Sequence, residues 1–133
     1  MALLALPACI ALAAAACPLP PAALQQGALQ QAAVQVVWAP DPKPIVVGRH
    51  FALELQICPA AAELTRIDAS MPEHRHGMNY RPSLKRLSGA SAEHPARWRA
   101  EGLLFHMPGR WELRVEVQTA DGSVTLLTSI TVP

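Results

Sequence analysis

The chain has 133 residues, of which 51% are hydrophobic and 16% are charged, which suits one compact domain rather than two. The formal net charge is only +1, and no basic stripe alternates with aromatic residues, so we expect no nucleic acid partner. The first forty residues contain no charged side chain, and the first one in the sequence is Asp41.

The N-terminus, MALLALPACIALAAAAC, is an apolar run that ends in small residues. This pattern is typical of a secretory signal peptide, and Pro7 makes a transmembrane helix the weaker interpretation. No Lys or Arg precedes the run. We therefore expect residues 1–23 to form a signal peptide, with an uncleaved membrane anchor as the alternative, and the protein to be exported to the periplasm or cell envelope.

The position of cleavage is open at this stage. Cleavage within Ala14–Ala16 would leave Cys17 first, where a bacterial lipoprotein carries its lipid, although the residue three before that cysteine is Ala where Leu is preferred. Cleavage after Ala22 or Ala23 would instead release a soluble protein. Residues 24–32 carry no charge and no strong pattern, and we expect them to be a spacer.

Cysteine usage predicts a domain without a disulfide. Cys9 and Cys17 lie in the expected signal region, so Cys58 would be the only thiol of the mature domain. A single cysteine forms no internal bridge, and stability would have to come from a packed core. Cys58 follows an alternating run and precedes Pro59, so we expect a semi-buried, unreactive residue near the end of a strand.

Beyond the spacer, the hydrophobic pattern has a period of two residues, which is typical of half-buried strands in antiparallel sheets. The clearest case is WELRVEVQ, where apolar and polar residues alternate strictly. The predicted strands are AVQVVW, HFALELQIC, ELTRIDASM, SLKRLS, ARWRAEGLLFH, WELRVEVQ and VTLLTSITV.

Turn signals separate these strands at intervals of roughly ten residues. Asp121-Gly122 predicts a hairpin, and Pro108-Gly109 predicts a second hairpin between ARWRAEGLLFH and WELRVEVQ. About seven strands with this spacing predict an all-β, immunoglobulin-like antiparallel β-sandwich over residues 33–133. Its largest core side chains would be Trp38, Trp98 and Trp111.

The stretch MPEHRHGMNYRP concentrates metal-binding side chains in a predicted loop between strands. Imidazole nitrogen and thioether sulfur together are a ligand set that suits copper and does not suit calcium or magnesium. In an extended segment, His74 and His76 would project to the same side, with Met71 and Met78 beside them. A solvated polar loop is the alternative interpretation of the same residues.

A third internal methionine strengthens the copper interpretation, because Met107 stands directly beside His106. If the turn at Pro108-Gly109 and the loop after Ser70 lie at the same end of the sandwich, one of these two residues would complete the site. Catalytic motifs are absent from the sequence, so we expect no enzyme. A hydrolytic zinc site built from three histidines, His74, His76 and His106, is disfavoured by the neighbouring sulfurs.

The segments MPEHRHGM and LLFHMPGRWELRVEV together resemble the YtkA-like family, which is related to FixH-like proteins. The resemblance covers about residues 34–133 and implies a small exported or membrane-anchored immunoglobulin-like domain with a suggested role in copper handling. Carried over by motif, it implies four ligands: Met71, His74, His76 and Met107. Arg75 stands where the family often has Gly.

Two functions follow from these observations. The first is an exported protein that buffers or delivers Cu(I) or Cu(II) to a donor, acceptor or membrane complex, with Met71, His74, His76 and Met107 as ligands and Met78 and His106 as further candidates. The second is a non-catalytic accessory module, without metal, that docks on a membrane complex such as a respiratory oxidase under assembly.

Overall fold

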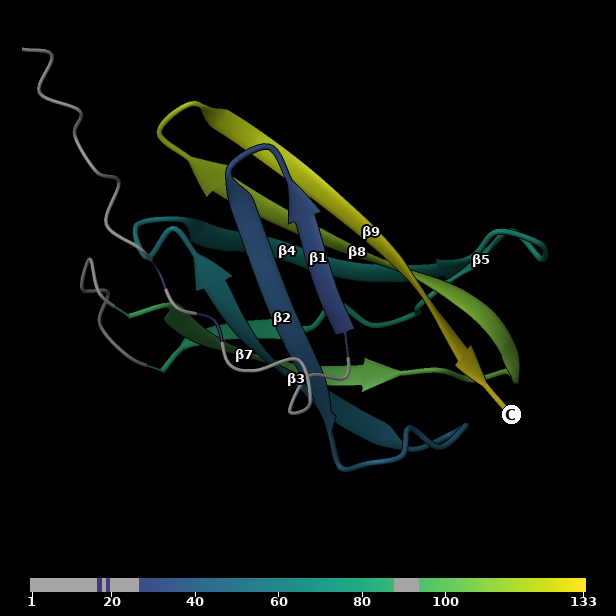
Figure 1. Cartoon of the computed structure of the whole chain (residues 1–133). Coiled ribbons are helices and arrows are strands. Elements are labelled where there is room, and N and C mark those ends of the chain that lie inside the picture. Colours follow the sequence, from purple (N-terminus) through teal and green to yellow (C-terminus); the bar gives the residue numbers. More distant parts are fainter. Residues whose placement is uncertain (1–16, 18, 20–26, 88–93) are drawn as a thin grey trace, which may run out of the picture.

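The computed structural model describes residues 17, 19, 27–87 and 94–133, and it is an all-β sandwich of two antiparallel sheets (Figure 1). The predicted fold class is therefore confirmed. The signal peptide expected over residues 1–23 lies almost entirely outside the described residues. The strands are β1 (Gly27–Gln31), β2 (Val34–Asp41), β3 (His50–Cys58), β4 (Glu63–Met71), β5 (His76–Gly77), β6 (Ser83–Arg86), β7 (Ala96–Leu104), β8 (Gly109–Thr119) and β9 (Gly122–Val132).

The five-stranded sheet has the order β1-β2-β3-β7-β6 and buries one side of each alternating strand. Leu55 at its centre lies opposite Trp38 on one neighbouring strand and Trp98 on the other. The two indoles are each 7% exposed, so both belong to the core, as the sequence predicts. On the opposite face of the sheet, Glu54 and Gln56 turn away from the core.

The four-stranded sheet has the order β5-β4-β8-β9. Its longest pairing joins β8 to β9 without a register shift, from Gly109 opposite Val132 to Thr119 opposite Gly122. Gly122 has φ of +126°, a conformation that favours glycine in a tight turn. This confirms the hairpin predicted at Asp121-Gly122.

The second predicted hairpin is wrong. β7 belongs to the five-stranded sheet and β8 to the four-stranded sheet, so the turn at Pro108-Gly109 carries the chain across the core. At this crossing Phe105 stacks on Trp111, with ring centroids 4.5 Å apart. Two alternating strands joined by a turn can form a hairpin within one sheet or can belong to two facing sheets. Both arrangements bury one face of each strand, so the alternation does not specify which strand is the neighbour.

Two strands were not predicted from the sequence. The segment expected to be a spacer contains β1, which pairs with β2 along its whole length. Gly27 is required there, because a Cβ atom on it would lie 2.4 Å from the Trp38 ring, so the indole rests directly on the backbone of β1. β5 is only two residues long and pairs His76 with Met71.

The prediction of a domain without a disulfide is also wrong. Cys17 and Cys58 form a disulfide, with their Cα atoms 5.8 Å apart, which joins the N-terminal segment to the end of β3. The sequence argument failed because it assigned Cys17 to the cleaved region. A thioether-linked lipid on Cys17 would need the same Sγ atom, so this pairing and lipidation exclude one another.

Candidate metal centre

Four connections between strands lie at one end of the sandwich, which we call the histidine end: residues 42–49, 72–75, 78–82 and 105–108 (Figure 1). Contacts join them to one another and to the strands beside them. The Gly48 N–H donates to the Phe105 carbonyl oxygen at 2.8 Å, and the Arg110 guanidinium pairs with Glu73 at 3.3 Å. The loop after Ser70 and the turn at Pro108-Gly109 therefore do share one end, as the copper interpretation required.

Four of the five histidines in the sequence lie at the histidine end: His50, His74, His76 and His106. The sequence offered no signal for His50, because no methionine is near it in the chain. It opens β3, and its ring meets the Tyr80 ring edge-on at 5.4 Å. Its place at this end follows from the strand order alone.

Contrary to the prediction from the sequence, His74 and His76 do not lie on one side of an extended segment. Residues 72–75 form a turn, in which the His74 N–H donates to the Met71 carbonyl oxygen at 3.2 Å. Arg75 has φ of +53°, the left-handed conformation that glycine adopts at least cost. This explains why a small residue would suit the position, and why alternation of side chains does not hold through the turn.

His76 instead lies beside His106, a residue thirty positions later in the chain. Their ring centroids are 6.1 Å apart with the ring planes at 83°. His106 also meets Trp111 edge-on at 5.4 Å. Trp111 is fully buried and stacks on Phe105, so a rigid aromatic wall supports the His106 ring. Both imidazoles remain exposed to solvent.

Met71 is a core residue and only 1% exposed. Its terminal methyl group packs over Gly109, where a Cβ atom would lie 2.9 Å from that methyl group. Met71 lies opposite His76 in the pairing of β4 with β5, so the two residues are neighbours across these strands. Met71 therefore fills the end of the sandwich core.

The other two methionines are more accessible. Met107 is half-buried against the core, and its carbonyl oxygen accepts a hydrogen bond from the Trp111 Nε1–H at 3.0 Å. Met78 is also half-buried, and its N–H donates to the Ala69 carbonyl oxygen at 3.0 Å. Ala69 lies two residues before Met71 on β4. Met107 is thus partly accessible, and the turn that carries it is held by Trp111, which also contacts His106.

Within the described ranges, no group of three or more His, Cys, Asp or Glu side chains is placed to hold a metal ion. The three histidines of a hydrolytic zinc site are not brought together there. The arrangement offers two imidazoles, with Met71 opposite His76 in the β4–β5 pairing and Met107 next to His106 in the chain. Thioether sulfurs are candidate further ligands at the histidine end, and copper accepts them.

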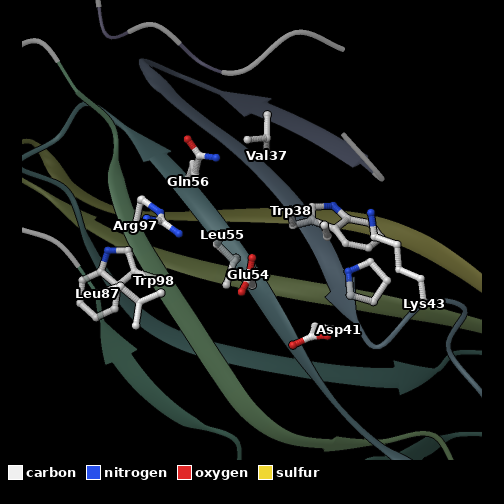
Figure 2. Close-up of a pocket in the computed structure, with 12 residues that line it drawn as sticks. Val37, Trp38, Asp41, Lys43, Glu54, Leu55, Gln56, Leu87, Arg97 and Trp98 are labelled. Carbon is white, nitrogen blue, oxygen red and sulfur yellow. The ribbon is translucent and has the colours of Figure 1, made fainter. Parts of the chain in front are cut away.

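A groove with a volume of about 500 Å³ lies elsewhere, along β2, β3 and β7 (Figure 2). Figure 2 shows Trp38 and Trp98 on opposite sides of it, with Glu54 and Asp41 between them. Arg99 forms ion pairs with Asp41, Glu54 and Glu101 beside this groove. The hydrogen bonds to Glu101 and Asp41 raise the pKa of the Arg99 guanidinium, and this one cation faces three carboxylates.

Comparison with known proteins adds no assignment. The chain matches no model of a protein family, and neither the curated proteins nor the solved structures include a significant match. The resemblance to YtkA-like proteins thus rests on the two motifs alone. In the part of the chain that the structure describes, no helix is long and apolar enough to span a membrane.

Proposed function

We propose that this chain is an exported protein that binds one copper ion at the histidine end, and that it buffers or delivers the metal rather than catalysing a reaction. The observation that carries the proposal is the contact between His76 and His106. His76 belongs to β5, and His106 belongs to the connection between β7 and β8. Two methionines are close to them along the backbone, since Met71 lies opposite His76 in the β4–β5 pairing and Met107 follows His106 in the chain.

The separation of the two rings suits a shared metal. Metal–nitrogen bonds of imidazole are about 2.0 Å long, so two imidazoles on one ion have ring centroids up to roughly 6 Å apart. The separation is 6.1 Å, so a shared ion would need a nearly linear pair of nitrogens. Cu(I) tolerates such low coordination and takes thioether sulfur as an additional ligand. The proposed ligands are His76 and His106 with one sulfur from Met71 or Met107.

The pairing of Cys17 with Cys58 supports export. Disulfides persist in oxidising compartments and are rare in the cytosol, so this pairing favours the periplasm or cell envelope. It also leaves no free thiol on these two residues, and copper at the histidine end would then bind to nitrogen and thioether alone.

The proposal is tested by anaerobic competition for Cu(I) against a chromogenic chelator, on the disulfide-bonded protein. We expect one ion per chain. The double variant His76→Ala, His106→Ala should lose most of the affinity, while His74→Ala and His94→Ala should bind as the wild type does. Equal affinity in the double variant would refute the assignment.

The choice of sulfur is tested separately. Met71→Leu and Met107→Leu keep an apolar side chain of similar volume, so the fold should tolerate both. The variant that removes the sulfur ligand should weaken Cu(I) binding, and Met78→Leu should not. Unchanged affinity in both Met71→Leu and Met107→Leu would contradict a sulfur ligand at this end.

A further inference from the structure

Charge is distributed unequally between the two ends of the sandwich. The connections of the histidine end carry four cations, Lys43, Arg49, Arg75 and Arg81, against the single carboxylate of Glu73. At the opposite end, the described residues of the connections carry one charge, that of Asp121. A chain with a net charge of only +1 therefore has a strongly basic end.

These four cations are available to a partner. All four side chains are exposed, and none forms an ion pair within the ranges that the structure describes. Glu73, in contrast, is paired with Arg110. The positive charge of this end is therefore not compensated by its own carboxylate.

Exposed apolar side chains lie among these cations. Val46 is 43% exposed in the first connection, between Lys43 and Arg49. Tyr80 is 49% exposed and stands next to Arg81. Its ring is held edge-on against His50, which links this segment to the start of β3. Only four large hydrophobic side chains are as exposed in the described residues, and two of them are here.

We infer that the histidine end docks on an anionic phospholipid surface. Basic residues near such a surface are attracted to its negative potential, while an exposed tyrosine and an aliphatic side chain suit the boundary between headgroups and acyl chains. An acidic protein would satisfy the cations but would not account for exposed Val46 and Tyr80 between them. The inference rests on charge and exposure and is independent of copper.

The test is sedimentation of the full, disulfide-bonded chain with vesicles of phosphatidylcholine alone or of an equimolar mixture with phosphatidylglycerol. We expect binding to the mixed vesicles to exceed binding to phosphatidylcholine and the excess to be weakened by salt. Each basic residue near the surface contributes roughly fivefold to partitioning, so the variant Arg49→Gln, Arg75→Gln, Arg81→Gln should bind on the order of 100-fold less.

A matched control removes the same net charge from the sheet faces: Lys85→Gln, Arg97→Gln, Arg114→Gln. This variant should retain most of the binding. Both variants keep the same N-terminal segment, so its apolar residues contribute equally to each. Equal loss in the two variants would show that net charge alone matters and would overturn the inference, as would absence of wild-type binding to the mixed vesicles.

Discussion

The two ends of the sandwich differ in what they contribute. The end of the sandwich opposite the histidine end, which we call the far end, holds the disulfide at Cys58. It also has an apolar recess of about 300 Å³ lined by the connections 32–33, 59–62 and 120–121, most of whose residues are small. The histidine end holds imidazoles, thioethers and exposed cations. The far end therefore cross-links the chain, while the histidine end carries the proposed ligands and the exposed cations. We expect substitutions at the far end to change stability and substitutions at the histidine end to change binding.

The largest effect is expected where the two roles meet, at Trp111. It is fully buried, stacks on Phe105 and supports His106, so Trp111→Ala should lower the free energy of unfolding by about 3–5 kcal/mol and also weaken Cu(I) binding. Trp98→Ala is the control, because Trp98 is buried away from the histidines; it should destabilise without altering affinity. Denaturant unfolding measures the stability, and Cu(I) competition measures the affinity. A Trp111→Ala variant that binds Cu(I) as tightly as the wild type would contradict the role of Trp111 in supporting His106.

Loss of the disulfide should affect stability alone. The pairing spans 41 positions in the sequence. On the chain-entropy account, the variant Cys17→Ser, Cys58→Ser should be less stable by about 4 kcal/mol. Its Cu(I) affinity, measured at a temperature where it remains folded, should match that of the wild type. A large fall in affinity would place part of the metal site at the far end.

A smaller effect is expected at Gly109, which has φ of +123° and carries the Met71 methyl group directly above it. Gly109→Ala should cost about 1–3 kcal/mol of stability for the backbone strain and should also displace Met71. Gly122→Ala is the matched control, since Gly122 has φ of +126° and nothing within 4 Å of an added Cβ. If Met71 is the sulfur ligand, only Gly109→Ala weakens copper binding; equal affinities would instead favour Met107.

The smallest effect is expected for the ion pair between Arg110 and Glu73. The Arg110 side chain is 40% exposed and that of Glu73 is 63% exposed, so Arg110→Ala should change stability by about 0.2–1 kcal/mol. Arg114→Ala provides a comparison on the same strand. Thermal unfolding should show similar small shifts for both variants. A much larger shift for Arg110→Ala would mean that the 72–75 turn is more important to the fold than its exposure indicates.

Much of the fold could be predicted because the alternation of apolar and polar residues in each strand shows which of its faces is buried. The alternation in Glu112–Gln118 and the turn at Asp121-Gly122 were sufficient for the β8–β9 hairpin. The crossing at Pro108 could not be predicted in this way, because period-two burial does not say which sheet a strand joins. β1 was missed because GALQQ alternates weakly, and its position depends on Trp38, which rests on Gly27.

The candidate site was predicted in composition but not in geometry. The motif brought Met71, His74 and His76 to attention because they are close in the sequence. The pairing of His76 with His106 depends on the crossing between sheets and on Trp111, which no local pattern specifies. The disulfide was missed for a related reason, since a cysteine assigned to a leader is not considered as a partner.

The most direct test follows the backbone amide signals of the ¹⁵N-labelled, disulfide-bonded protein during anaerobic titration with Cu(I). Our account predicts saturable changes at one equivalent, confined to residues around Met71, His76 and His106, with the signals around Cys58 unmoved. An unchanged spectrum, or changes centred on the far end, would contradict a copper site at the histidine end.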